Sequence, residues 1–287
     1  MIARHCIGVM QGRLLPMVGG RIQAFPGDGW EREFDLAAEI GFGSIELTVE
    51  MASLEIHPVC TAPGRAALKR LVLDTGVRAA GLCCDTFMER PLVSADDTIR
   101  AEGTAILERL LAGAAEAGMP MVELPMLGDN TLKGAPAPDA FAAILDRALS
   151  TADRLGIDIL LETDLDAEAQ AAFLTRHAHP RLGINYDCGN STYFGYDPAA
   201  EIAAYGPSIR NVHIKDCTRA DYSQPLGRGD TDFATIFADL ARTGYQGGFI
   251  LQAARQTDDL AAARDYLAFT ADLVGRHLTA PGETTEA

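Results

Sequence analysis

Short runs of apolar, β-branched residues alternate with longer Ala- and Leu-rich amphipathic segments along most of the chain. This alternation is typical of a parallel sheet whose strands are joined by crossover helices. The pattern predicts eight strand-and-helix repeats. The expected strands are 6–10, 44–49, 77–83, 121–124, 157–161, 182–186, 209–212 and 248–251, and the expected helices are 30–40, 62–74, 95–117, 137–155, 166–178, 198–205, 233–242 and 258–278.

Eight consecutive repeats in about 280 residues match a single (β/α)₈ TIM barrel, an α/β fold, by number and by length. Residues 1–280 are expected to form this barrel and residues 281–287 a flexible tail. An open doubly wound sheet is the alternative. However, the first strand is followed by Gln11, Gly12, Arg13 and a long loop, and not by a GxGxxG turn that opens a helix. One barrel domain is therefore the better interpretation.

Composition excludes several classes of partner. The 287 residues are 48% hydrophobic and carry a formal net charge of -16, and no Lys/Arg cluster is long enough to follow a phosphate backbone. Nucleic acid and membranes are thus not expected partners. The six cysteines form no CxxC pair, and neither a signal sequence nor a membrane-spanning run is evident. We expect a soluble cytoplasmic protein with reduced thiols, and the sequence leaves open whether it forms a homo-oligomer.

Four successive strands are expected to end in a polar side chain. Glu162 follows the strand at 157–161, Asp187 follows the next strand, and His213 and Gln252 end the last two. The C-terminal tips of parallel barrel strands face one mouth, where the active sites of such folds lie. Neighbouring strands are about 4.8 Å apart, so the four side chains can reach a common point.

Two carboxylates, an imidazole and an amide oxygen suit a divalent cation such as Mn²⁺, Mg²⁺, Co²⁺ or Zn²⁺. Taken alone, Asp187 would only shape a turn and His213 would be a core histidine. Their occurrence together with Glu162 and Gln252 on adjacent tips favours a metal site.

The residues carry a resemblance to a known superfamily. The motifs are MQGRL at 10–14, YDxGN at 186–190, HIKD at 213–216 and LGxGxxDF at 226–233. With these motifs the chain resembles the xylose isomerase-like TIM-barrel superfamily, in its sugar isomerase and epimerase group. The resemblance covers nearly the full length. It implies a metal held by Glu162, Asp187, His213 and the residue on the eighth strand.

The family pattern also places a glutamate on the eighth strand, as a metal ligand and as one of two acid/base groups. This chain has Gln252 there. Its amide oxygen can still bind a metal, but the amide cannot take or give a proton. A metal-bound Glu162 therefore has to act with a different second group.

Candidates for that second group lie on other strand tips. Lys215 alternates with His213 along its strand, so both are expected to point inward. It is the preferred proton carrier or oxyanion stabiliser, with Asp216 beside it as a further candidate. Glu46 and Glu123 lie in strands whose register leaves open whether they face the mouth, and both are candidates for lining the substrate site.

Substrate contacts are expected from the loops around the mouth. Gln11 and Asn190 are predicted to bind substrate hydroxyls. Four arginines follow the first, seventh and eighth strands and are predicted to bind a substrate carboxylate or phosphate, namely Arg13, Arg219, Arg228 and Arg255.

The leading hypothesis is a divalent-metal-dependent isomerase or epimerase that acts on a small sugar, sugar phosphate or polyhydroxy acid. Glu162 or Lys215 would move a proton next to a carbonyl. A metal-dependent lyase or dehydratase of a sugar acid, and a non-catalytic sugar-binding barrel, are the alternatives. An endonuclease of the same superfamily would need a histidine-rich three-metal site and a basic surface, and the sequence has neither.

Overall fold

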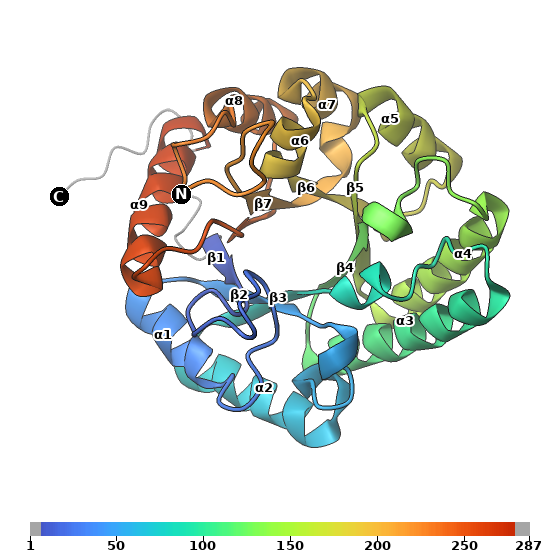
Figure 1. Cartoon of the computed structure of the whole chain (residues 1–287), viewed down its shortest axis with the longest axis horizontal. Helices are drawn as coiled ribbons and strands as arrows, with labels where there is room; N and C mark the ends of the chain where they lie inside the picture. The colour runs from blue at the N-terminus through green and yellow to red at the C-terminus, as the bar shows by residue number, and fades with distance from the viewer. Residues whose placement is uncertain (1–6, 279–287) are drawn as a thin grey trace.

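The computed structural model describes residues 7–278, in which eight parallel strands close into a barrel surrounded by helices (Figure 1). Strand order follows the chain, and β8 closes the ring on β1 through the pair Val9 and Leu251. The predicted TIM barrel is confirmed. The strands are β1 (Ile7–Met10), β2 (Ser44–Thr48), β3 (Arg78–Cys83), β4 (Met121–Met126), β5 (Asp158–Thr163), β6 (Leu182–Asp187), β7 (Ile209–Ile214) and β8 (Gly248–Leu251).

The helices form the outer layer and agree closely with the predicted segments. They are α1 (Arg32–Ile40), α2 (Ala62–Thr75), α3 (Asp97–Ala117), α4 (Pro138–Leu155), α5 (Ala167–Arg176), α6 (Cys188–Phe194), α7 (Pro198–Tyr205), α8 (Phe233–Thr243) and α9 (Asp259–His277). The short helix α6 was not predicted, because its Cys-Gly-Asn start indicates a turn. Cys6 of the first predicted strand and the predicted tail at 281–287 lie outside the described residues.

Local signals in the sequence explain where the long helices begin and end. Asp96 begins α3 by accepting the backbone N–H groups of Thr98 and Ile99, and Asp258 begins α9 in the same way through Ala261. Gly118 ends α3 with a φ of 86°. Residues other than glycine rarely adopt this left-handed backbone conformation, and Gly118 lets the chain turn back toward the next strand.

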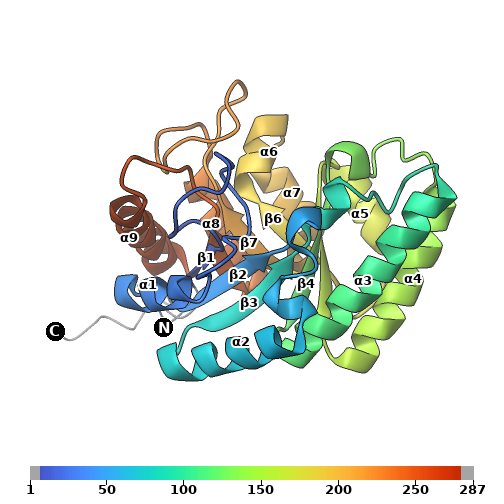
Figure 2. The same cartoon turned by 60° about the horizontal axis from the view of Figure 1, so that its bottom comes forward.

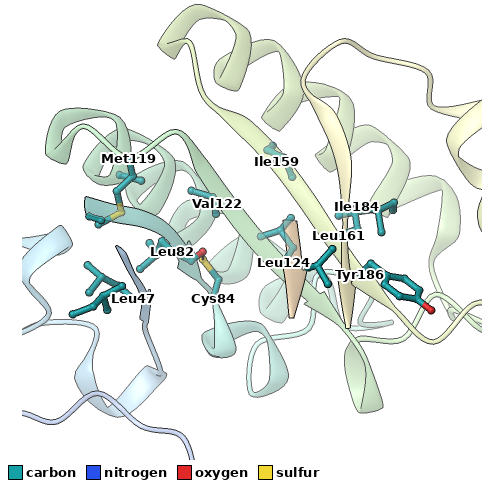
Figure 3. Close-up of a cluster of buried hydrophobic side chains, with 14 of the residues drawn as sticks. Leu47, Leu82, Cys84, Met119, Val122, Leu124, Ile159, Leu161, Ile184 and Tyr186 are labelled. Atoms are coloured by element: carbon teal, nitrogen blue, oxygen red, sulfur yellow. Dashed lines mark hydrogen bonds between the residues drawn. The ribbon is translucent and has the colours of Figure 1, made fainter. Parts of the chain in front are cut away.

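The strands have apolar outer faces, and buried polar residues such as Glu46, Glu123 and His213 lie on the inner faces of β2 and of β4 to β7. Outward side chains such as Leu47, Val122, Leu161 and Ile184 belong to one buried cluster between the barrel and the helices (Figure 3). The inner face of β1, β3 and β8 holds a separate small cluster of Met10, Cys83 and Ile250. Because side chains alternate along a strand, the residues between the outward ones are aimed into the barrel.

The C-terminal ends of the strands carry the longer loops. Figure 2 shows the loop after β1 and the loop between β7 and α8 rising on the same side of the molecule as α6. These loops surround the mouth of the barrel. Within residues 7–278, none of the helices combines the length and the apolar character that a membrane span requires.

Candidate active site

Three neighbouring strand tips supply the expected ligands. Glu162 on β5, Asp187 on β6 and His213 on β7 are 5%, 5% and 0% exposed. A register shift between β6 and β7 sets Asp187 opposite His213. One ligand atom of each residue lies within 4.8 Å of the others. His213 Nδ1 is 3.6 Å from Glu162 Oε2 and 4.0 Å from Asp187 Oδ2.

Two of these ligand atoms lack a hydrogen-bond partner. Asp187 Oδ1 accepts the backbone N–H of Asn190 at 2.8 Å and so begins α6, whereas its Oδ2 is buried without a hydrogen bond. His213 Nδ1 is buried and unpartnered as well. Each unsatisfied buried polar atom costs about 1–3 kcal/mol. The arrangement therefore fits a divalent cation that accepts both lone pairs.

The other nitrogen of His213 faces a second pair of carboxylates. His213 Nε2 lies 3.4 Å from Glu46 Oε2 and 3.2 Å from Glu123 Oε2, and both glutamates are 0% exposed. Glu46 also accepts an N–H from Asn211 at 2.9 Å. A metal-binding histidine commonly donates its second N–H to a carboxylate, which fixes the tautomer and the ring orientation. These contacts leave Nδ1 as the nitrogen available to a metal.

The carboxylates around His213 outnumber the positive charges that could balance them. Burial raises the pKa of Glu162 well above its usual range, and the charges of Glu123 and Asp187 raise it further. Burial, together with the charge of Glu46, raises the pKa of Glu123 in the same way. Burial alone would lower the pKa of His213, but the charges of Glu46 and Glu162 outweigh it and raise that pKa. A bound divalent cation would relieve this crowding.

Asn190 connects the ligands to the predicted proton carrier. Its amide donates to Glu162 Oε1, and its carbonyl oxygen accepts from Lys215 Nζ at 3.0 Å and from the hydroxyl of Tyr222. Lys215 Nζ lies 3.3 Å from the centroid of the Tyr222 ring and 3.8 Å from Asp187 Oδ2. The ammonium is thus held by an amide, an aromatic ring and a carboxylate at the edge of the ligand cluster.

A cavity of about 250 Å³ opens beside this cluster. Of the predicted site residues, Glu162, Lys215, Gln252 and Arg13 line it. Its other walls come from the ends of β3 and β4 and from the loops after β1, β3, β4 and β7, through Ile22, Gln23, Cys83, Asp85, Met88, Pro125, Leu127, Tyr222 and Ser223. The volume lies just below the usual range of about 300–1,000 Å³ for ligand pockets, which indicates a small substrate.

Gln23 joins three walls of the cavity. Its Oε1 accepts from Gln252 Nε2 at 3.0 Å and from Arg13 Nη2 at 3.3 Å, while its Nε2 donates to Asp85 Oδ2 at 2.9 Å. Thr48 also donates its hydroxyl to Asp85 Oδ2 at 2.9 Å. The carboxylate of Asp85 is therefore fixed in the cavity wall and connected to the strand-eight position through one side chain.

Several predicted contacts are placed elsewhere. Glu46 and Glu123 lie deep in the barrel against His213, outside the cavity lining. Gln11 is fully buried and accepts the backbone N–H of Thr48. Asp216 accepts backbone N–H groups from Gly227, Arg228, Gly229 and Thr231 and thereby holds the loop after β7, so its carboxylate is not free to carry protons.

The four predicted arginines do not gather at the mouth. Arg219 is exposed and donates to the carbonyl of Gly195, and Arg228 is exposed as well. Arg255 donates to the carbonyls of Gly12 and Leu15 and pairs with Asp259 at 3.0 Å. Their guanidinium groups have long, flexible stems, so position after a strand does not determine where they point. Only Arg13 of the four lines the cavity.

Asp85, Gln23 and Tyr222 were missed by the sequence reasoning. Asp85 lies two residues after the end of β3 in the run GLCCD, so the rule that identified the other strand tips extends to it. Gln23 and Tyr222 come from the middle of long loops. No periodicity indicates their place.

Comparisons with known proteins agree with this geometry. A family model described as "Xylose isomerase-like TIM barrel" matches residues 34–273. L-ribulose-5-phosphate 3-epimerase UlaE of Salmonella paratyphi C is 25% identical over 256 residues, which cover 84% of this chain and 89% of the relative. UlaE of Escherichia coli K12 is likewise 25% identical, over 259 residues, with the same shares of both chains.

Solved structures share the fold at lower sequence identity. The structure of an L-ribulose 3-epimerase has a TM-score of 0.77 and 19% identity, covering 97% of this chain and 99% of that one. D-allulose 3-epimerase from Methylomonas sp., in complex with D-allulose, has a TM-score of 0.72 and 19% identity, covering 93% and 96%.

Proposed function

Because the chain belongs to the xylose isomerase-like TIM barrel family, we propose that it is a divalent-metal-dependent epimerase or isomerase of a small sugar, sugar phosphate or polyhydroxy acid. One observation carries the proposal. Ligand atoms of Glu162, Asp187 and His213 meet beside a cavity of about 250 Å³, and two of them have no hydrogen-bond partner. Relatives that are named as 3-epimerases of L-ribulose 5-phosphate, L-ribulose and D-allulose support it.

Glu162, Asp187 and His213 would hold the metal, and the amide oxygen of Gln252 is the proposed fourth ligand. Oxygen and imidazole donors suit Mn²⁺, Mg²⁺, Co²⁺ or Zn²⁺. The bound ion would supply Lewis acidity to the substrate oxygens next to the reacting carbon. Glu46 and Glu123 would act only through His213, by orienting its ring.

Epimerisation requires proton transfer on both faces of one carbon. A base on one wall takes the proton from the C–H bond, and the electron pair moves toward the adjacent carbonyl oxygen. An acid on the other wall then returns a proton to the opposite face. Glu162 and Lys215 provide such groups on the side of β5 and β7.

Asp85 provides a group on the facing side. In a ring of eight strands, β3 lies opposite β7, so Asp85 and Lys215 approach the cavity from facing walls. Gln23 and Thr48 both donate to Asp85 Oδ2, and Oδ1 accepts the weaker hydrogen bond of the Cys83 thiol at 3.5 Å. We assign to Asp85 the proton transfer that the amide of Gln252 cannot perform.

A solvent-exchange experiment tests the proposal. The purified protein is loaded with Mn²⁺ and incubated in D₂O with L-ribulose 5-phosphate, L-ribulose, D-allulose and a set of sugar acids, and the products are followed by NMR. We expect deuterium at the carbon next to the carbonyl and formation of the epimer, both dependent on the metal. If the protein binds no divalent ion and exchanges no proton of any of these compounds, the proposal fails.

A metal-dependent dehydratase or lyase is the second candidate, favoured by Gln252. Such reactions begin with the same proton abstraction but need only one strong base. In the same experiment, a dehydratase would convert a sugar acid into a product lacking one water, and no epimer would form.

A further inference from the structure

The lining of the cavity beside the ligand cluster changes character with depth. Glu162 and Lys215, which would act on the reacting carbon, are only 5% and 6% exposed. Three lining side chains are exposed, and none of them is charged. They are Ile22, Met88 and Tyr222, at 46%, 38% and 42%, and we call them the rim. The cavity therefore has a polar floor and an apolar opening.

The rim brings together side chains from three loops. Ile22 follows β1, Met88 follows β3 and Tyr222 follows β7, so they approach the opening from different sides. Met88 also contacts the loop after β4, since a Cβ built on Gly128 would lie 3.2 Å from Met88 Cε. Leu127, in the same loop, extends the apolar lining. Single exposed apolar residues are normal on protein surfaces, but here they share one opening.

The cations of the cavity do not lie at the rim. Of the basic residues in 7–278, only Arg13 and Lys215 line the cavity, and Arg13 is 8% exposed. Lys215 Nζ donates to Asn190 Oδ1 at 3.0 Å and lies 3.3 Å from the centroid of the Tyr222 ring. Arg13 donates to Gln23 at 3.3 Å. Both positive charges are thus buried and already have partners in the floor.

The charges next to the rim are unfavourable for an anion. Glu89 and Asp221 adjoin two of the rim residues in the chain, and both are exposed. Arg21 adjoins the third and pairs with Glu50. A phosphate is normally bound by Arg or Lys side chains or by a helix N-terminus. At this rim a phosphate would meet apolar side chains and carboxylates, so its loss of water would not be compensated.

The rim faces the end of the substrate that does not react. This step rests on the proposed function, which places the reacting carbon between Glu162, Lys215 and Asp85 at the floor. We propose that the substrate is a non-phosphorylated, terminal-deoxy sugar, with a methyl group at the end remote from the reacting carbon, and that Ile22, Met88 and Tyr222 select this end. A methyl group loses contact with water against such side chains at no polar cost.

Two series of sugars that differ only at the remote end test the proposal. L-ribulose and D-allulose are each compared with the analogue that carries a terminal methyl group and with the terminal phosphate ester. The Mn²⁺-loaded full chain is used, kcat/KM is measured from deuterium exchange, and dissociation constants are measured by calorimetry. We expect the methyl compound to exceed the hydroxymethyl compound about fivefold in kcat/KM, and the phosphate ester to fall at least about tenfold below it.

The results separate this inference from the proposed function. Exchange of the phosphate esters in preference to the methyl compounds would overturn the inference and leave a metal-dependent epimerase. If no compound of either series exchanges, the proposed function fails, and the dissociation constants then decide the inference. Binding of a phosphate ester as tightly as its methyl counterpart, or no binding of either, overturns it.

A charge placed on the rim should change the preference. In Met88→Lys an ammonium faces the remote end, so kcat/KM for the phosphate ester should rise about tenfold relative to the methyl compound. Leu73→Lys is the matched control, because Leu73 is an 84% exposed leucine of α2 that does not line the cavity. Its preference should equal that of the unmodified chain. Equal preferences in Met88→Lys and Leu73→Lys would mean that the rim does not contact the substrate.

Discussion

The imidazole of His213 has two nitrogen-bearing edges, which we call the Nδ1 face and the Nε2 face. Carboxylates lie at both, but the two sets differ in what they can do. Glu46 and Glu123 face Nε2, and Glu162 and Asp187 face Nδ1. Either set could form a three-residue metal site by distance alone. On the Nε2 side both glutamates are fully buried outside the cavity lining, and Glu46 Oε1 and Glu123 Oε2 lack a hydrogen bond as well. On the Nδ1 side Asp187 Oδ2 is unpartnered and Glu162 reaches the cavity.

The difference shows that ligand type does not by itself define a metal site. What separates the two faces is their depth in the barrel. The deeper pair can orient the imidazole, whereas the shallower pair lies where a substrate could reach an ion bound there. Variants on each face test this assignment.

The largest effect is expected on the Nδ1 face. Asp187→Ala removes a proposed ligand and leaves Glu162 and His213 as an incomplete set, so affinity for Mn²⁺ should fall at least about 100-fold and activity about 1,000-fold. Calorimetric titration with Mn²⁺ and turnover measurements check this. Glu201→Gln is the matched control, because Glu201 is also a buried carboxylate but contacts Ser191, Tyr186 and Tyr205 instead. Unchanged Mn²⁺ affinity in Asp187→Ala would show that the ion does not bind on the Nδ1 face.

Asp85→Asn should separate proton transfer from metal binding. The amide keeps the size of the side chain but cannot take a proton, so kcat should fall about 100-fold while Mn²⁺ affinity stays the same. Asp164→Asn serves as the control, since Asp164 accepts from Thr131 and does not line the cavity. An Asp85→Asn enzyme with normal kcat would leave Lys215 as the second group.

A smaller effect is expected on the Nε2 face. Glu46→Gln replaces the carboxylate that faces His213 Nε2 with a neutral amide. Changes in residues that support a metal ligand typically lower metal affinity about 10–100-fold. The Mn²⁺ titration used for Asp187→Ala measures it. If Glu46→Gln lowers Mn²⁺ affinity more than Asp187→Ala does, the ion binds between Glu46, Glu123 and His213 instead.

Among the variants of the proposed ligands and their supporting residues, Gln252→Glu is expected to change metal affinity least. A charged oxygen replaces the amide oxygen at the proposed fourth ligand, so Mn²⁺ should bind about tenfold more tightly. Activity then distinguishes the remaining functions. Gain of activity from a silent parent indicates a barrel that had lost its catalytic group, and loss of an existing activity indicates that the amide is required.

Much of the fold was predictable because it depends on local patterns. The alternation of strand and helix periods predicted eight repeats whose bounds differ from the structure by a few residues. The closing pair of β1 and β8 followed from the number of repeats. The helix α6 was missed because Asp187 both ends a strand and begins a helix.

The site was predictable only where a side chain is fixed by its strand. Glu162, Asp187 and His213 lie on or directly beside regular strands, so alternation determines their direction. The depth of Glu46 and Glu123 depends on how the strands are staggered around the barrel, and single-strand patterns do not encode this. Arg219, Arg228, Gln23 and Tyr222 come from loops, where long-range contacts decide the conformation.

The four backbone hydrogen bonds that Asp216 accepts have a consequence for how such barrels diversify. They fasten residues 227–231 to the end of β7, so the segment between these two points forms a closed excursion that carries Tyr222 to the substrate cavity. Its length and sequence can change without moving β7 or α8, because the fastening uses backbone groups and one aspartate. Replacement of this segment could then change the substrate range, while the proposed metal ligands beneath it stay in place.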